Sequence, residues 1–308
     1  MNEALKKVIE TVLPPSAVQA LKASRANLKQ RSAKAAFDTP GPSNSFLPSS
    51  QIELLQSRYP LAIPYQYDPA ALLQRGVERK REIERFVSTK AKKTLELAGG
   101  DAMVSGVLAR DGAVATAIDL STNHVDPRAI AFGAKALAAD AEKLPFGDGS
   151  FDVVFSYNAF EHFPNPEIVL KEALRVLGPD GIAYFSFGPL YRSSYGLHAM
   201  HSITVPFCHY LWSRDDMDAY ISKAGMGRIE YETLNEWTID QFRSLWDRWA
   251  PYAAKTLYRE VPSIHGTDLV NKHAECFRGK VDKFEDLTVA VIQIALKRTS
   301  KPFSQSVQ

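Results

Sequence analysis

Residues 93–102, Lys-Thr-Leu-Glu-Leu-Ala-Gly-Gly-Asp-Ala, decide how the rest of the chain is interpreted. A short apolar strand carries the carboxylate of Glu96 and runs into a turn of small residues. Because strands and helices alternate after this turn, we expect it at the carboxyl edge of the first strand of a parallel sheet. Glycine and alanine allow a bound molecule to approach the backbone, and the helix expected over 101–110 directs its amide donors to the same place. The stretch therefore predicts a nucleotide-sized pocket.

The composition is that of an ordinary globular protein. The chain has 308 residues, of which 45% are hydrophobic and 23% are charged, so neither disorder nor a membrane bundle is indicated. A formal net charge of +2 gives no global case for nucleic-acid binding. Cys208 and Cys276 are too few and too distant for a disulfide framework or a cysteine-rich zinc site. We see no secretory signal at the start and expect a cytoplasmic location.

Four regions are expected from the breaks in pattern. They are a basic helical extension and linker at 1–45, an irregular segment and helix covering the core at 46–92, a main domain at 93–298 with insertions at about 189–213 and 235–285, and a polar tail at 299–308.

The extension reads as a helix broken at Pro14-Pro15 and rich in lysine and arginine. Such an arm can lie on an anionic membrane or bind a partner, and it can equally be a solvated helix packed on its own domain. Both interpretations stay open at this point.

Hydrophobic periodicity predicts an α/β fold. Strands are expected at 94–97, 114–119, 136–139, 152–157, 182–187, 227–234 and 287–297, and the last two are separated by helical material. Helices are expected at about 70–89, 101–110, 122–134, 165–177 and 213–224, and residues 178–181 are expected to form a turn. The order predicts a seven-stranded, mostly parallel sheet with helices on both faces, together with a helical extension and helical insertions.

An acidic residue ends the second predicted strand. Asp119 follows Glu96 by one strand–helix–strand unit, so its carboxylate can reach a ribose at the neighbouring strand tip and accept both hydroxyls of the diol. The same spacing would serve a nicotinamide dinucleotide, so Asp119 does not by itself decide the nucleotide.

Residues 139–154, Ala-Asp-Ala-Glu-Lys-Leu-Pro-Phe-Gly-Asp-Gly-Ser-Phe-Asp-Val-Val, closely resemble a motif of class I S-adenosylmethionine-dependent methyltransferases. Residues 96–102 resemble the first motif of that family, Glu/Asp-x-Gly-x-Gly-x-Gly, with Ala98 and Ala102 at the first and third glycine positions and Gly100 at the second. The resemblance covers roughly residues 75–235 and the final strand. It implies a Rossmann-like fold and S-adenosylmethionine as cofactor.

The resemblance also implies roles for individual residues. Glu96 is expected to order the turn and the ammonium side of the cofactor, and Asp119 to hold the ribose. Asp140 would accept the exocyclic amine of adenine, while the amide of Ala141 meets a ring nitrogen. The expected cofactor-binding residues are Glu96, Ala98, Gly99, Gly100, Asp119, Leu120, Asp140, Ala141 and Asn158.

His162 follows the fourth strand and is the candidate catalytic base, because its free pKa lies closest to neutral. The alternative is that His162 caps or packs the next helix. Tyr191, His198 and His201 are expected in the substrate wall. Because the sulfonium already makes the methyl group electrophilic, we expect the site to position a nucleophile and to need no metal.

The expected function is methyl transfer from S-adenosylmethionine to a small-molecule acceptor, at an oxygen of a glycan, lipid-linked or natural-product substrate. A methyltransferase-like binding or scaffold module without activity is one alternative. A nucleic-acid methyltransferase is another, but no nucleic-acid partner is expected, because Asn158-Ala159-Phe160-Glu161 stands where Asn/Asp-Pro-Pro-Tyr/Phe would be. The sequence does not indicate an oligomeric state.

Overall fold

The structure is a computed structural model that describes residues 14–60 and 68–301. Two groups of segments each pack mainly with themselves. We call them the helical unit (Met1–Pro60, Ala199–Ile229 and Pro262–Thr288) and the sheet unit (Leu61–His198, Glu230–Val261 and Val289–Gln308). The boundaries expected at residues 45, 92 and 298 remain predictions.

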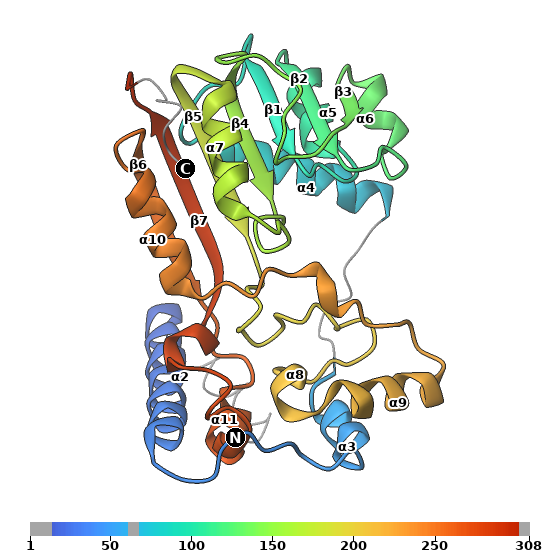
Figure 1. Ribbon diagram of the computed structural model, residues 1–308, viewed down its shortest axis with the longest axis vertical. Coiled ribbons are helices and arrows are strands. Elements are labelled where there is room, and N and C mark those ends of the chain that lie inside the picture. Colours follow the sequence, from blue (N-terminus) through green and yellow to red (C-terminus); the bar gives the residue numbers. More distant parts are fainter. Residues whose placement is uncertain (1–13, 61–67, 302–308) are drawn as a thin grey trace. The chain divides into compact units, whose positions relative to one another are not determined.

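The sheet unit is built on seven strands in the order β3-β2-β1-β4-β5-β7-β6 (Figure 1). These are β1 (Lys93–Leu97), β2 (Val114–Asp119), β3 (Lys135–Ala138), β4 (Phe151–Tyr157), β5 (Leu177–Phe187), β6 (Ala253–Pro262) and β7 (Val289–Arg298). The first five strands pair in parallel, and β7 runs antiparallel to β5. The structure thus confirms the α/β fold and the seven-stranded, mostly parallel sheet.

Helices cover both faces of this sheet. Successive strand residues point to opposite faces, so Val154 packs with α7 (Pro166–Val176) and α10 (Ile239–Trp249), whereas Val153 packs with α4 (Pro69–Ile83) and α5 (Met103–Arg110). Fully burying one such side chain stabilises the fold by about 1.5–3 kcal/mol. The alternation seen in the sequence therefore fixes which helix layer each strand residue contacts.

Helix starts follow the capping signals in the sequence. The carboxylate of Asp68 accepts hydrogen bonds from the amides of Ala70 and Ala71 at the start of α4. In the helical unit, α9 (Arg214–Ala224) begins after Ser213 and ends at Gly225, whose φ of 65° is left-handed. Both starts agree with the prediction, whereas α6 (Pro127–Ala131) is shorter than the helix expected at 122–134.

The sixth strand was predicted in the wrong place. Residues 227–234 contain only the short 3₁₀ helix η1 (Tyr231–Thr233), and β6 lies instead in the stretch expected to be helical. β6 is an edge strand that includes Lys255, Arg259 and Glu260, and only Ala253 of its residues is buried, so it lacks the apolar alternation of a half-buried strand.

The turn expected at 178–181 lies within β5. Leu177 pairs with Phe151, but the next pair joins Ile182 to Val153, so four residues of β5 lie opposite one residue of β4 and three of them are extra. Asp180 there has a left-handed φ of 61°. The turn signal therefore marks a bulge at the start of β5 rather than a break before it.

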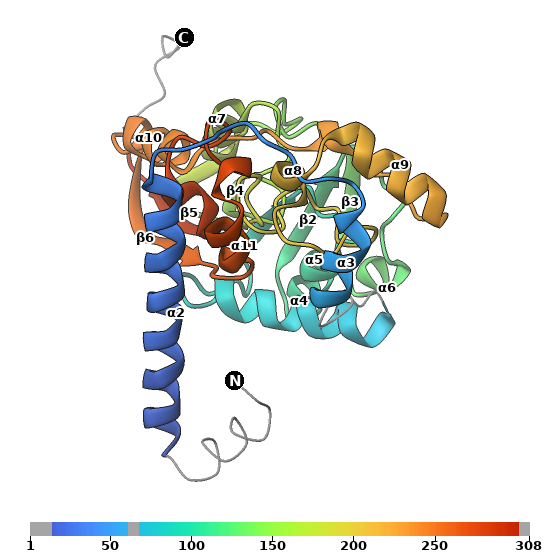
Figure 2. The same ribbon diagram turned by 90° about the horizontal axis from the view of Figure 1, so that it is seen from below.

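The helical unit consists of α2 (Pro15–Asp38), α3 (Gln51–Arg58), α8 (Cys208–Leu211), α9, α11 (Thr267–Lys272) and the short helices η2 (Ala274–Cys276) and η3 (Phe284–Leu287). α3 lies in the part of region 46–92 that was expected to be irregular and corrects that expectation, and residues 61–67 lie outside the described part. The C-terminal half of α2 packs beside α11, while its N-terminal half extends away from it (Figure 2).

Arg278 binds the chain that follows α2. Its guanidinium donates hydrogen bonds to the carbonyls of Ala36, Phe37 and Pro42, and its own carbonyl accepts from the amide of Asn44. The linker expected at the end of the region 1–45 is therefore bound to its own unit. None of the helices in residues 14–60 and 68–301 is both long and apolar enough to cross a bilayer.

Candidate functional site

A cavity of about 560 Å³ opens where β1, β2, β3 and β4 end. The parallel register brings these tips together, because Leu97 pairs with Ile118 and Asp119 pairs with Ala138. The volume suits a small-molecule site, for which about 300–1,000 Å³ is usual. The lining residues are Ala98, Ile118, Asp119, Leu120, Ala139, Asp140, Ala141, Glu142, Asn158, Ala159, His162, Phe163, Pro164 and Asn165.

Asp119 joins the turns after β1 and β2. Its Oδ2 accepts a hydrogen bond from the amide of Gly100 at 2.9 Å, and its Oδ1 accepts from the amide of Leu120 at 2.7 Å. Each carboxylate oxygen can accept a second hydrogen bond, and the side chain is only half-buried at the cavity. The carboxylate is thus fixed in place and still able to bind a ligand diol.

The turn after β1 adopts the backbone expected of a glycine-rich motif. Ala98, Gly100 and Ala102 have φ values of 50°, 52° and 56°, all left-handed. An alanine in this conformation costs about 1–2 kcal/mol, so the alanines keep the motif geometry under backbone strain. Ala98 lines the main cavity, and Gly99 and Gly100 line a neighbouring cavity of about 10 Å³.

Glu96 lies beneath this turn and does not line either cavity. The side chain is buried, and its Oε2 accepts hydrogen bonds from the amide of Ser105 at 3.1 Å and from its hydroxyl at 2.7 Å. Burial raises the pKa of Glu96 to about 7, against the hydrogen bonds from Ser105. These contacts tie β1 to α5, and the expected role of Glu96 near the cofactor ammonium group stays a prediction.

The loop that carries Asp140 and Ala141 is bound to α7 by Arg175. The guanidinium donates to the carbonyls of Leu144 and Phe146 at 3.1 and 2.8 Å. Its Nε also donates to Glu172 at 2.7 Å, and the carboxylates around it hold the pKa of Arg175 above its usual value. The sequence reasoning gave Arg175 no role, although its spacing from Glu172 is that of a helix ion pair.

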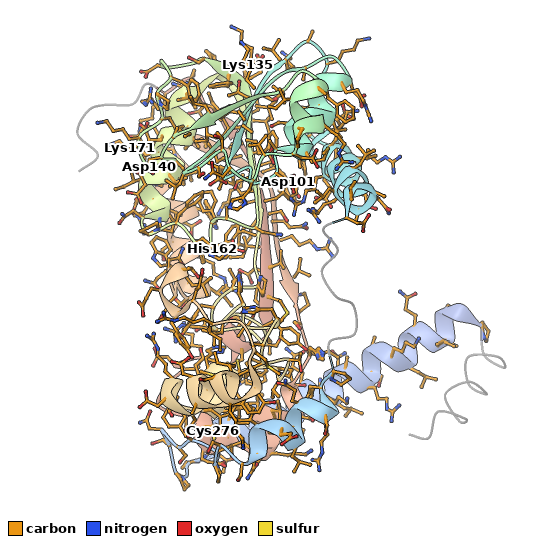
Figure 3. All side chains as sticks on the ribbon, turned by 90° about the vertical axis from the view of Figure 1, so that its right-hand side faces the viewer. Asp101, Lys135, Asp140, His162, Lys171 and Cys276 are labelled. Carbon is orange, nitrogen blue, oxygen red and sulfur yellow. The ribbon has the colours of Figure 1, made fainter. Side chains whose placement is uncertain are left out.

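His162 and His198 lie together at one side of the cavity. Figure 3 labels His162 below Asp140, and both residues line the cavity. Nδ1 of His162 is 2.7 Å from the carbonyl of Thr233, and the rings of His162 and His198 are 4.9 Å apart. Burial lowers the pKa of His162 and lowers that of His198 to about 4, so both imidazoles are neutral at pH 7.

The other residues expected in the substrate wall are placed differently. His201 is exposed, belongs to the helical unit and is 3.3 Å from the carbonyl of Arg228. Tyr191 is half-buried in the sheet unit.

Asn158, expected to bind the cofactor, lies at the end of β4 with a left-handed φ of 51° and lines the cavity. Its backbone amide donates to the carbonyl of Ser186.

Glu161 is a buried carboxylate to which the sequence reasoning gave no role. Its Oε1 accepts a hydrogen bond from the amide of Gly188 at 3.0 Å, while Oε2 has no partner among the described residues. Burial raises the pKa of Glu161 to about 7. In the sequence, the position of Glu161 directly before His162 is the one feature that indicated a place in the site.

Residues 95–185 match the model of a family described as "Methyltransferase domain". An uncharacterized methyltransferase from Mycobacterium sp. (strain JLS) is 34% identical over 133 residues, which are 42% of this chain and 50% of that protein. A ubiquinone biosynthesis O-methyltransferase from Coxiella burnetii (strain Dugway 5J108-111) is 27% identical over 115 residues, or 35% and 48% of the two chains. The chain thus spans about half the length of these curated relatives.

Among solved structures, an S-adenosylmethionine dependent methyltransferase from Mesorhizobium loti is 18% identical with a TM-score of 0.46, and the match covers 73% of this chain and 100% of that one.

The family match runs from β1 into β5 and includes the strained turn, Asp119, Asp140 and His162. The cavity fits an adenosyl group, because it combines the fixed carboxylate of Asp119, which can accept from a diol, with the acidic residue Asp140 at the next strand tip. The chain therefore contains a class I methyltransferase domain, and the cofactor of that family is S-adenosylmethionine.

Proposed function

We propose that the chain transfers a methyl group from S-adenosylmethionine to an oxygen of a small-molecule acceptor, namely a glycan, lipid-linked or natural-product hydroxyl. The observation that carries the proposal is the cavity that Asp119, Asp140 and His162 line together. Support for oxygen as the attacked atom comes from the Coxiella burnetii relative, which is named as an O-methyltransferase.

The residues divide the work by position. Asp119 binds the ribose diol, and Asp140 with the Ala141 amide binds the adenine, while bound S-adenosylmethionine supplies an electrophilic methyl group. In such a transfer the hydroxyl oxygen gains the methyl group, sulfur keeps the electron pair of the broken bond, and the hydroxyl proton has to leave. Nε2 of His162 carries a lone pair, since Nδ1 donates to a carbonyl. This lone pair is suited to accept the proton of the acceptor hydroxyl.

Calorimetry with S-adenosylmethionine tests the cofactor part of the proposal. Saturable binding to the full chain, weakened at least tenfold by Asp119→Ala and by Asp140→Ala, is the expected result. A wild-type chain that shows no binding would remove the proposal.

Transfer of isotope from a methyl-labelled donor to a metabolite extract tests the enzymatic part. Labelled small molecules that appear only with the wild-type chain support methyl transfer. Binding without any transfer would favour the alternative of a scaffold module, and label found in nucleic acid would favour the other alternative.

We also propose that the exposed half of α2 contacts an anionic membrane surface. Lys22, Arg25 and Lys29 are exposed there, and Leu21 and Leu28 are 49% and 62% exposed. Basic side chains beside exposed leucines suit the boundary of anionic lipid headgroups. Sedimentation with phosphatidylserine vesicles should fall when all three basic residues are changed to glutamine, and equal sedimentation would leave α2 with a structural role alone.

A further inference from the structure

Three side chains with metal-binding atoms converge beside the cofactor cavity. Glu161, His162 and His198 each offer one ligand atom, and the three atoms lie within 4.8 Å of one another. Glu161 and His162 follow β4, whereas His198 lies in the segment after β5. His162 also lines the cavity, so the cluster lies at its wall.

The hydrogen bonds of the two histidines leave one nitrogen of each ring with a lone pair. A carbonyl oxygen only accepts, so Nδ1 of His162 must carry the proton donated to Thr233, and Nε2 keeps the lone pair. By the same reasoning Nε2 of His198 donates to the carbonyl of Pro189 at 2.9 Å, and Nδ1 keeps the lone pair. Ligating histidines in metal sites are commonly oriented by such a bond from the other ring nitrogen.

Glu161 provides a second observation, which is independent of the hydrogen bonds of the two histidines. The residue is only 2% exposed, its Oε1 is held by the amide of Gly188, and its Oε2 has no hydrogen-bond partner among the described residues. A buried carboxylate oxygen without a partner costs the fold free energy unless a positive charge or a donor meets it. Oε1 is therefore bound by the chain, and Oε2 is left for a ligand.

We infer that Glu161, His162 and His198 bind one divalent transition-metal ion at the wall of the cofactor cavity. Two imidazoles and one carboxylate suit zinc or a related ion, whereas magnesium and calcium favour oxygen ligands. Tetrahedral bonds of about 2.1 Å separate ligand atoms by roughly 3.4 Å, so atoms that lie within 4.8 Å of one another would close by at most about 1.4 Å on binding. Three protein ligands leave a further position for a water or a substrate oxygen.

This inference rests on the proposed function and refines it. In this arrangement the lone pair of His162 binds the ion and no longer accepts from the acceptor hydroxyl. The hydroxyl oxygen binds at the open coordination position of the ion instead. A bound divalent ion makes such a hydroxyl more acidic, so the proton can leave to water while the oxygen attacks the methyl group. The acceptor class is then an alcohol or a phenol rather than an amine.

Zinc titration of the untagged, chelator-treated full chain tests the inference. Isothermal calorimetry and elemental analysis should give one zinc per chain, and Co²⁺ should give the visible absorption of a low-symmetry site. Glu161→Gln and His198→Gln should each weaken zinc binding at least tenfold and remove the cobalt spectrum. His201→Gln and His124→Gln are the matched controls, because both residues are exposed histidines outside the cluster, and both should bind as the wild type does.

S-Adenosylmethionine binding, measured on the same samples, separates this inference from the proposed function. Zinc bound equally by wild type and both cluster variants, or not bound at all, overturns the metal site even when cofactor binding is intact. Two cluster variants are used because Glu161 is buried, and circular dichroism identifies a variant that has not folded. If Glu161→Gln does not fold, the His198→Gln result alone decides.

Discussion

Ala98 combines a glycine-like backbone with a side chain that glycine lacks. Its left-handed φ of 50° is held by a turn that is fixed further by the bond from the Gly100 amide to Asp119. The surrounding contacts thus maintain a backbone conformation that is unfavourable for alanine. Strain in this turn should be measurable as a change in the free energy of unfolding when the strain is relieved.

Ala98→Gly should raise the free energy of unfolding by about 0.5–1 kcal/mol, since relief of strain outweighs the larger entropy of glycine in the unfolded chain. Urea denaturation followed by circular dichroism measures the change. Ala136→Gly in β3 is the control, because Ala136 has no positive φ, and it should lower stability by about 0.5–1 kcal/mol. Equal losses in both variants would show that the turn is not strained.

Glu96 should make the stability of the protein depend on pH. Its folded pKa of about 7 lies above the ordinary value of 4.5, so its contribution to stability is complete below pH 4.5 and is lost as pH rises through 7. A difference of one between the folded and unfolded pKa corresponds to about 1.4 kcal/mol. The free energy of unfolding should therefore fall between pH 5 and pH 8, and less steeply in Glu96→Gln.

Ser105→Ala serves as the opposite control for this measurement. Removal of the Ser105 hydroxyl takes away a donor that lowers the pKa of Glu96, so the fall in stability should extend to higher pH. Glu161 is present in all of these proteins and contributes equally. Identical pH profiles for wild type and Glu96→Gln would contradict the assignment.

At the scale of elements, the sequence pattern predicted the buried strands and the short, mostly exposed β3, and it missed β6. The bounds of β1, β2 and β4 agree with the predicted ranges within a residue or so. β6 is instead a charged edge strand that forms by pairing with β7, which lies further along the chain. Asp119 and Asp140 could be placed because both lie at strand ends: Asp119 is the last residue of β2, and Asp140 comes two residues after β3. The meeting of His198 with Glu161 could not, because it depends on the path of the chain after β5.

Arg175 should affect cofactor affinity without touching the cavity. A lysine cannot bind the carbonyls of Leu144 and Phe146 and the Glu172 carboxylate in the same fork, so Arg175→Lys should loosen the loop that carries Asp140. A loss of about 1 kcal/mol corresponds to a roughly fivefold weaker Kd for S-adenosylmethionine. Calorimetry measures this change.

Arg248→Lys is the matched control for the Arg175 variant. Arg248 also binds a carboxylate with two nitrogens, that of Glu167, but contacts no residue of the Asp140 loop in the described bonds. Its Kd for S-adenosylmethionine should stay within about twofold of the wild type. An equal weakening in both variants would mean that the effect is general and not transmitted through the loop.

At the scale of the whole molecule, the two halves of α2 should differ in their importance for stability. None of residues 16–28 is buried, whereas Ala33 is fully buried and Phe37 lies 5.9 Å from Phe284 between ring centres. A chain without residues 1–28 should unfold at the same urea concentration as the full chain.

A chain without residues 1–40 should instead lose at least about 2 kcal/mol, from the buried apolar surface and from the acceptors of Arg278. Equilibrium denaturation of the two truncated chains makes the comparison. Equal stability of both would show that the contacts of Ala33 and Phe37 do not stabilise the helical unit.

The bond from Arg278 to the carbonyl of Phe37 joins residues 241 positions apart. On the ribosome, the segment around Phe37 emerges long before Arg278 is synthesised, so Phe37 stays uncovered until then. A nascent chain arrested before Arg278 would present this segment to chaperones and proteases. Quality control would therefore recognise an incomplete product by this uncovered segment rather than by its broken end.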